Sequence, residues 1–337
     1  MDSLQDWPEP VVRVQSLSDS GATVIPPRYV KPPSERPVVN GGSGNHDLSI
    51  PVVDFNCADN ASAVADACKV WGFFQVINHG VSHELMRRAR EDWRQFFHLP
   101  MEEKQMYANS PKTYEGYGSR LGTQKGAILD WGTTTSSTSF HCVSRVMTSG
   151  QLCLHLYGTK KGKQTLRFLS FRSTRKFLFL LIYKYSTEFT RGTVEEYGRE
   201  VVSFCERVMK VLALGLGVDE GRLQTAFGGK ESGVCMRVNF YPKCPQPDLT
   251  LGLSSHSDPG GITVLLPDDQ VKGLQVRRGN AWVTVKPVPD SFIVNVGDQI
   301  QVSELAVARW LSIFISLLFA SLMCVSRWWL NKTVGGL

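Results

Sequence analysis

Two residues with metal-binding side chains, His256 and Asp258, stand two positions apart in the stretch Leu253–Leu266. Residues i and i+2 of an extended chain point to the same side, so the imidazole and the carboxylate would meet at one point in space. Together they supply two thirds of the two-histidine, one-carboxylate set that holds Fe(II) and leaves coordination positions open. A His-x-Asp pair also arises by chance in surface turns, so the surrounding sequence must decide between the two interpretations.

Longer motifs flank this pair. Upstream stands Met236-Arg-Val-Asn-Phe-Tyr-Pro-Lys-Cys-Pro-Gln-Pro247, and downstream stand Gly273-Leu-Gln-Val-Arg-Arg-Gly-Asn-Ala-Trp282 and Phe292-Ile-Val-Asn-Val-Gly-Asp298. Together they resemble the plant 2-oxoglutarate- and Fe(II)-dependent dioxygenases, in the branch of flavonol synthase, leucoanthocyanidin dioxygenase and the jasmonate-hydroxylating oxygenases. The resemblance runs without a break over about 198–302, and a second piece covers about 49–131.

The resemblance implies an α+β fold, a double-stranded β-helix (jelly roll) core with flanking helices, in which two facing sheets enclose the metal. It divides the chain into a flexible N-terminal arm (1–46), an N-terminal dioxygenase domain (47–131) and a truncated Fe(II)/2-oxoglutarate core (195–302). Two segments depart from the family: a basic insert (132–194), which we expect to be disordered, and an apolar tail (303–337). Because the tail replaces family strands, we expect a jelly roll that is incomplete at its C-terminus, with unpaired strand edges.

The resemblance also implies roles for single residues. His256 and Asp258 would be iron ligands, with no further catalytic residue implied. Tyr241 and Asn239 would contact 2-oxoglutarate, and Arg237 would reach toward an acidic substrate. The structural alternatives are a half-buried strand tyrosine and a solvated edge arginine. Fe(II) and the co-substrate 2-oxoglutarate are the implied cofactors, and ascorbate is a further candidate.

One more histidine calls for a decision between a ligand role and a structural role. His79 follows the aromatic, β-branched run 71–77 and stands directly before Gly80, which is typical of a strand closed by a turn. The resemblance places it in a structural Asn-His-Gly turn. We therefore expect it to be structural.

The implied activity is that of an oxidoreductase that hydroxylates or desaturates a small flavonoid- or jasmonate-like molecule of plant secondary metabolism. Two departures oppose full activity. In the family a later histidine supplies the third iron ligand, but His256 is the last histidine of this chain. The late Arg-x-Ser pair that binds the distal carboxylate of 2-oxoglutarate in the family is also absent. A neutral residue cannot replace the bidentate contact of an arginine. The alternative hypothesis is a catalytically dead or mis-spliced family member that lacks the third iron ligand.

The two departing segments have unusual compositions. Residues 132–194 hold ten Lys and Arg against one acidic residue, Glu188. Such a charge suits nucleic acid, but no recognition motif accompanies it, and we expect no nucleic-acid partner. Residues 310–326 are 17 uncharged residues, at the lower limit for a membrane helix. A tail-anchored, non-enzymatic binding protein is therefore a second alternative, and the less favoured one.

The composition, 42% hydrophobic and 20% charged over 337 residues, is that of a globular protein. The eight cysteines form no C-x-x-C pair, which favours reduced thiols. The first ten residues lack the basic and apolar regions of a signal peptide. We expect a cytoplasmic location, with the nucleus as a second compartment, a small-molecule substrate and a monomer.

Overall fold

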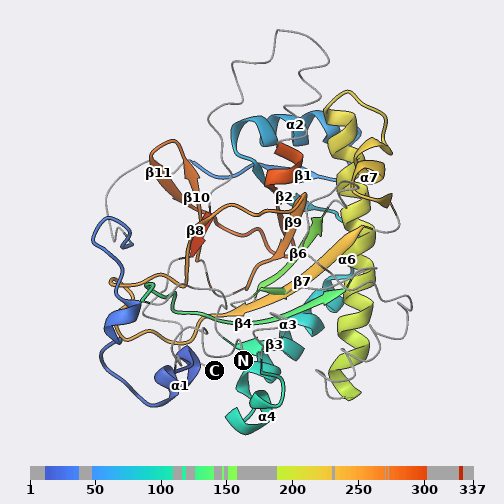
Figure 1. Ribbon diagram of the computed structural model, residues 1–337. Coiled ribbons are helices and arrows are strands. Elements are labelled where there is room, and N and C mark those ends of the chain that lie inside the picture. The colour runs from blue at the N-terminus through green and yellow to red at the C-terminus, as the bar shows by residue number, and fades with distance from the viewer. Residues whose placement is uncertain are drawn as a thin grey trace, which may run out of the picture.

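Two β-sheets face one another, and helices cover the outer face of the larger sheet (Figure 1). The computed structural model describes residues 12–37, 48–108, 116–118, 126–139, 146–147, 151–157, 188–229, 232–269, 271, 273–301 and 326–328. This arrangement is the jelly-roll core with flanking helices that the sequence predicts.

The larger sheet has nine strands in the order β1-β2-β12-β9-β6-β7-β4-β3, and the short β5 pairs with β7. Its central pairs, β12 with β9, β9 with β6 and β6 with β7, are all antiparallel. The strands are β1 (Val52–Asp54), β2 (Phe73–Ile77), β3 (Gly116–Gly118), β4 (Thr133–Ser139), β5 (Val146–Met147), β6 (Gln151–Tyr157), β7 (Gly233–Phe240), β9 (Ile262–Leu266) and β12 (Phe292–Val296).

The smaller sheet has four strands in the order β11-β10-β13-β8. They are β8 (Leu253–His256), β10 (Leu274–Arg278), β11 (Ala281–Thr284) and β13 (Ser326–Trp328). All three pairings are antiparallel, and the register partner of His256 is Ser326. The strand that carries the histidine of the His-x-Asp pair therefore has a hydrogen-bonded neighbour from the tail.

The helices are α1 (Val14–Asp19), the 3-10 turn η2 (Pro27–Tyr29), α2 (Asn60–Val70), α3 (His83–His98), α4 (Met101–Gln105), α6 (Glu188–Gly215) and α7 (Arg222–Ala226). The side chain of Ser82 caps α3 by accepting a hydrogen bond from the Leu85 N–H at 3.4 Å. Glu84 lies in the first turn of this helix, where the helix dipole favours an acidic side chain. The long helix α6 stands beside the larger sheet, on the side away from β8, β10 and β11 (Figure 1).

Alternate residues of the larger sheet belong to two separate cores. On the outer face, residues such as Phe74, Val264 and Val294 pack with α6 residues such as Phe204. On the inner face, Leu265 and Ile293 are among the residues that pack with Leu253, Leu274 and Val276 of the smaller sheet. This period of two gives the sheet an apolar helix-covered face and an inner face that looks toward the second sheet.

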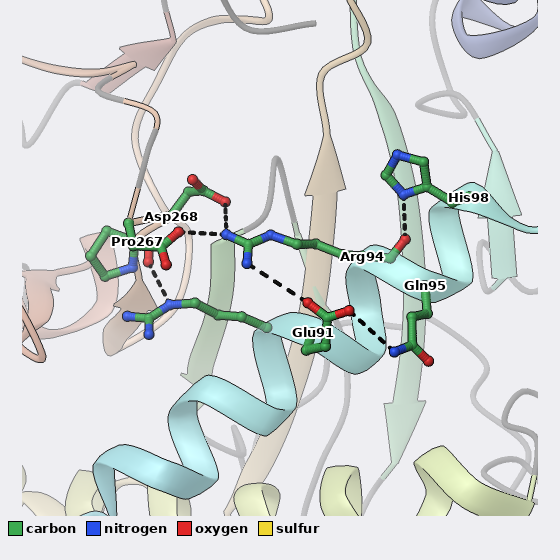
Figure 2. A network of polar contacts seen from close by, with 8 residues as sticks. Glu91, Arg94, Gln95, His98, Pro267 and Asp268 are labelled. Carbon is green, nitrogen blue, oxygen red and sulfur yellow. Dashed lines mark hydrogen bonds and ion pairs between the residues drawn. The ribbon is translucent and has the colours of Figure 1, made fainter. Parts of the chain in front are cut away.

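A charged clamp fixes α3 against the loop that follows β9. Arg94 contacts Asp268 at 3.1 Å and Glu91 of its own helix at 4.0 Å, and Arg90 donates to the Pro267 carbonyl at 3.1 Å (Figure 2). The clamp ties a helix of the N-terminal part of the chain to a central strand of the core. It lies on the helix-covered side, away from the inner face.

The N-terminal arm corrects one expectation, because its described part, 12–37, is packed against the core. Val14, Ile25 and Tyr29 are buried together with Trp131 and Cys244. The Trp131 ring meets the Tyr29 ring edge-on at 5.2 Å between centroids. The proline and glycine content predicted flexibility because the arm has no core of its own. Instead, its apolar side chains are buried against residues 129–131.

The insert corrects a second expectation. Disorder was expected throughout 132–194, but β4, β5 and β6 pair with β7, and α6 begins at Glu188. The physical reason is visible in the sequence: a threonine-rich run forms β4, and alternating leucines form β6, both suited to a pleated strand. Residues 140–145, 148–150 and 158–187 lie outside the described residues.

The tail corrects a third expectation, because β13 pairs with both β8 and β10 and fills the gap between them. These two edges are therefore not left unpaired. Residues 302–325 and 329–337 lie outside the described residues, and with them most of the apolar run 310–326. In the part of the chain that the structure describes, no helix combines the length and apolar character needed to cross a membrane.

Candidate metal site

His256 and Asp258 lie close together at the end of β8. His256 ends β8, and Asp258 follows two residues later, with 3.6 Å between Nε2 of the histidine and Oδ1 of the aspartate. The two side chains are 20% and 13% exposed, so a small ligand can reach a largely buried pair. Two donors in adjacent positions on an octahedral ion, at about 2.1 Å from it, are about 3 Å apart. A small closing movement would therefore let both atoms bind one cation.

The second oxygen of Asp258 is held by two donors from the larger sheet. Thr263 Oγ1 donates to Oδ2 at 2.7 Å, and Asn295 Nδ2 donates to the same oxygen at 2.9 Å. Thr263 and Asn295 are direct register partners on β9 and β12. Outer partners of this kind orient a ligating carboxylate, and here they leave Oδ1 as the oxygen nearest to His256.

His256 is oriented through its other ring nitrogen. Nδ1 lies 2.9 Å from the Ser254 carbonyl oxygen. A carbonyl only accepts, so Nδ1 donates this hydrogen bond, and in the neutral ring Nε2 is the nitrogen that keeps a free lone pair. This is the tautomer that a metal ligand requires.

Ser254 is itself anchored from behind by the N-terminal arm. Its Oγ donates to Asp130 Oδ1 at 2.5 Å and accepts from Lys31 Nζ at 2.9 Å, and Lys31 pairs with Asp130 at 2.8 Å. The side chain of Lys31 is only 3% exposed. A buried ion pair thus supports the strand that carries His256.

The loop that carries Asp258 is fixed by a close backbone approach. Asp298 N donates to the Asp258 carbonyl at 2.9 Å, and Gly297 N donates to the Gly261 carbonyl at 2.6 Å. A Cβ at position 297 would lie 2.9 Å from the Asp258 carbonyl oxygen and still closer to Gly260 O. Only glycine fits there, which explains the Gly297-Asp298 sequence after β12.

The three other predicted site residues come from β7 and the residue after it. Arg237 and Asn239 share the inner face of β7, because the intervening Val238 belongs to the helix-covered core. Arg237 is half-buried and Asn239 is 7% exposed. The Tyr241 ring rests on Gly132, where a Cβ would lie 3.0 Å from its Cε1. β6 alone separates β7 from β9, the strand of Thr263.

The polar atoms of β7 are suited to a polar co-substrate. The side-chain oxygen of Asn239 is buried and has no hydrogen-bond partner among the described residues. The oxygen and nitrogen of an amide can be exchanged by rotation, so this group can donate to a bound carboxylate. The Tyr241 hydroxyl is buried as well. Both observations fit the 2-oxoglutarate roles that the resemblance implies, and these roles remain predictions.

The metal-binding set is incomplete within the described side chains, since no group of three or more His, Cys, Asp or Glu gathers there. Two donors fit an Fe(II) site by type, tautomer and outer support, and no described side chain supplies a third. The sequence has no histidine after His256, and the site accordingly shows two donors among the described side chains.

His79 has the structural role expected of it. It is 1% exposed; Val81 N donates to its Nδ1 at 3.1 Å, and Nε2 lies 2.8 Å from the Asp290 carbonyl. Burial lowers the pKa of this imidazole, and the hydrogen bond to Asp290 opposes that shift only in part. The ring packs against Phe292 and Phe204 on the helix-covered face.

Sequence reasoning missed the supporting residues Thr263, Asn295, Lys31 and Asp130. Asn295 and Thr263 sit at inward positions of otherwise apolar strands, so a polar residue breaking an apolar alternation was the available signal. Lys31 carried no such signal, because its partner Asp130 is 99 residues away in sequence.

Comparisons with known proteins identify the family of this chain. The model for the non-haem dioxygenase in morphine synthesis N-terminal region matches residues 50–141, and the 2OG-Fe(II) oxygenase superfamily model matches residues 232–305. Jasmonate-induced oxygenase 1 of Arabidopsis thaliana is 47% identical over 306 residues, which cover 88% of this chain and 68% of that protein. Leucoanthocyanidin dioxygenase of Malus domestica is 33% identical over 308 residues, covering 86% and 76%.

A solved structure extends the agreement to three dimensions. The crystal structure of JOX2 in complex with 2OG, Fe and JA is 42% identical to this chain with a TM-score of 0.74, and the match covers 97% of this chain and 81% of that one. The resemblance seen in the motifs is thereby confirmed for sequence and for fold. The chain belongs to the 2OG-Fe(II) oxygenase superfamily, oxidoreductases that use Fe(II) and 2-oxoglutarate to oxidise small molecules.

Proposed function

We propose that this chain binds Fe(II) and 2-oxoglutarate and hydroxylates or desaturates a small carboxylic acid of plant metabolism. The observation that carries the proposal is the pair formed by His256 Nε2 and Asp258 Oδ1 at 3.6 Å. Its outer partners already hold the histidine tautomer and the carboxylate orientation that metal binding needs.

The residues divide the work as follows. Bound Fe(II) together with 2-oxoglutarate would supply the oxidising chemistry with O2. His256 and Asp258 would hold the ion, while Thr263 and Asn295 keep the carboxylate fixed. Tyr241 and Asn239 would orient the 2-oxoglutarate. The neighbouring inner-face position on β7, Arg237, would bind the carboxylate of the substrate.

A jasmonate-like acid is the substrate class that best fits the charge at Arg237. A half-buried guanidinium gains most from an anionic partner with two oxygens. Support comes from the relatives: one is named a jasmonate-induced oxygenase, and the JOX2 structure is described as a complex with JA. The cytoplasmic location and the monomeric state expected from the sequence remain predictions.

A second candidate function is metal binding without turnover. It is favoured by the two-donor set within the described residues and by the missing late Arg-x-Ser pair. In this case the chain would hold a divalent ion weakly and would fail to convert 2-oxoglutarate.

The test compares wild type with Asp258→Asn and with the matched control Asp66→Asn, whose carboxylate is 71% exposed on α2. Co2+ absorption would report metal binding, and succinate release with Fe(II), 2-oxoglutarate and jasmonic acid would report turnover. We expect wild type and the control to bind Co2+ and release succinate, and Asp258→Asn to do neither. Binding without succinate would select the second candidate, and a wild type that binds no metal would refute both.

The substrate class has its own arm of this test. Succinate release with jasmonic acid should exceed release with its methyl ester, because the ester lacks the charge that Arg237 would bind. Arg237→Gln should remove that preference for the acid. Equal rates with acid and ester in the wild type would contradict the acidic-substrate assignment and leave the metal site unaffected.

A further inference from the structure

A recess of about 590 Å3 lies between the N-terminal arm and two later parts of the chain. Most of its lining comes from the arm, and the rest comes from Ile128 and from the loop after β7, at Gln246 and Leu249. The His-x-Asp pair and the predicted site residues of β7 are not among its lining residues. Its volume falls within the range of about 300–1,000 Å3 that is typical of small-molecule sites.

The lining of this recess is mainly apolar and partly open to solvent. Val24 and Ile128, two of its lining residues, are 65% and 42% exposed. Pro27, Val30 and Leu249 add further apolar surface. Exposed apolar patches bordered by polar groups are a common feature of ligand-binding grooves. The recess therefore favours a ligand with a hydrocarbon body.

Arg36 gives the recess a positive charge. Its Nε donates to the Lys31 carbonyl at 2.8 Å, which holds the half-buried guanidinium at the recess. Among the described residues no carboxylate pairs with Arg36, and no acidic residue lines the recess. The ammonium group of Lys31 is already engaged, because it pairs with Asp130 at 2.8 Å. The terminal nitrogens of Arg36 are therefore the charged donors that a ligand can reach.

We propose that this recess binds a small carboxylic acid with an apolar body, whose carboxylate pairs with Arg36. A guanidinium matches the two oxygens of a carboxylate, and the apolar lining would cover the hydrocarbon part. Gln246 adds a neutral donor, because its Oε1 accepts from Ile25 N at 2.9 Å and its Nε2 keeps hydrogens for a second partner. The inference is independent of the proposed function, since no residue of the recess would hold Fe(II) or 2-oxoglutarate.

The first test titrates octanoate into the metal-free wild type by isothermal titration calorimetry, with 1-octanol as the uncharged analogue. We expect octanoate to bind about fivefold more tightly than 1-octanol or better, because a charge-assisted hydrogen bond adds to the shared apolar contacts. Hexanoate should bind more weakly than octanoate, because fewer methylene groups leave water. A wild type that binds no octanoate, or that binds octanoate and 1-octanol equally, would overturn the inference and leave the proposed metal site untouched.

Variants then locate the bound acid. Arg36→Gln should lower the affinity for octanoate to that for 1-octanol, and Arg36→Lys, which keeps the charge, should restore part of it. Arg237→Gln, at the proposed substrate site, should keep the octanoate site that Arg36→Gln loses. If Arg237→Gln loses octanoate binding while Arg36→Gln keeps it, the acid binds beside β7 and the inference is wrong.

A further variant tests the apolar part of the recess without changing Arg36. Val24→Asp places a carboxylate at an exposed position of the lining, so the chain should fold while octanoate binding is lost through charge repulsion. The matched control is Val70→Asp at the end of α2, which is 42% exposed and should bind octanoate as wild type does. Thermal unfolding checks that both are folded. Wild-type octanoate affinity in a folded Val24→Asp would show that the acid does not occupy the recess.

Discussion

The two faces of the nine-stranded sheet are built by alternate residues of the same strands, yet they are stabilised in different ways. On the helix-covered face, Phe74, Val264 and Val294 are buried side chains within one large apolar cluster. On the inner face their sequence neighbours Gln75 and Thr263 form directed hydrogen bonds: Gln75 accepts from Val288 N at 2.7 Å, and Thr263 donates to Asp258 at 2.7 Å. The first face relies on apolar packing, whereas the inner face combines a smaller apolar cluster, which includes Leu265 and Ile293, with directed polar contacts.

This difference has a general consequence for where the chain tolerates change. Apolar packing is spread over many neighbours, so the effect of one substitution on the fold is graded. A directed contact to a ligating carboxylate has no substitute, so its loss affects the site while the sheet persists. The face that keeps the sheet folded and the face that would bind a metal can thus be separated by mutation.

The largest effect is expected behind β8, where the Lys31–Asp130 ion pair is largely buried. Lys31→Met leaves Asp130 without its ammonium partner at 2.8 Å and removes a donor to Ser254. Breaking a buried pair destabilises by about 3–5 kcal/mol, and the 14% exposure of Asp130 places the expectation near the lower end. Urea unfolding of Lys31→Met should show this loss of stability. A Co2+ titration should show weaker binding, because the strand that carries His256 loses its support.

The matched control for that change is Lys69→Met, which breaks the exposed Lys69–Asp66 pair on α2. An exposed pair contributes about 0.2–1 kcal/mol, so this variant should unfold close to wild type. Equal unfolding midpoints for the two variants would mean that the arm is not a support of the site.

A smaller and sharper effect is expected from two adjacent residues of β9 that lie on opposite faces. Thr263→Val removes the hydroxyl that donates to Asp258 and should weaken Co2+ binding by about 10–100-fold with little change in stability. Val264→Thr buries an unpaired hydroxyl at a position only 1% exposed and should destabilise by about 1–3 kcal/mol. Its metal affinity should stay that of the wild type.

Each of these variants is the control for the other, since both exchange a hydroxyl and a methyl group on the same strand. Co2+ titration gives the metal affinity of each protein, and urea unfolding gives the free energy of unfolding of each. If Thr263→Val loses as much stability as Val264→Thr, or if Val264→Thr loses metal affinity, the two faces are not separable.

The family, the jelly-roll fold and the His-x-Asp pair could be predicted from the sequence because the motifs that indicate them are local. His256 and Asp258 are two residues apart, and Arg237, Asn239 and Tyr241 repeat with the same period, so the spacing predicts that each set shares a face. In the structure, His256 lies on β8, and Arg237 and Asn239 lie on β7, while Asp258 and Tyr241 follow just after these strands. The jelly-roll core and the family follow from those motifs and agree with the observed sheets and relatives. The roles of Arg237, Asn239 and Tyr241 are still predictions.

What the sequence hides is pairing between distant strands. β6 lies in a basic segment whose Lys and Arg residues suggest a solvated chain, yet its leucines alternate as Leu152, Leu154 and Leu156 and pair between β9 and β7. Composition averaged over 132–194 masks a seven-residue alternation. Lys31 and Ser254 meet across 223 residues, and only the packing of the arm reveals that contact.

The smallest predicted effect separates the structural histidine from the metal-binding one. Burial lowers the pKa of His79, helped by the nearby charges of Arg207 and His83, while the Asp290 carbonyl and carboxylate act in the opposite direction. Below an unfolded-state pKa of about 6.5, the unfolded chain takes up a proton that the folded chain resists. The stability from this residue is therefore complete above that pH and is lost as the pH falls toward the lowered folded pKa.

Thermal unfolding between pH 7.5 and 5.5 would measure this loss, with His79→Gln as the variant. We expect the melting temperature of the wild type to fall more steeply across this range than that of His79→Gln, while both bind Co2+ equally well at pH 7.5. The helix-covered position of His79 between Phe204 and Phe292 is the reason, because a ring packed in an apolar core affects the fold through its charge and cannot reach the inner face. Parallel pH curves for the two proteins would mean that His79 does not cause this pH dependence, and lost Co2+ binding in His79→Gln would place this histidine with the site and end the division between the faces.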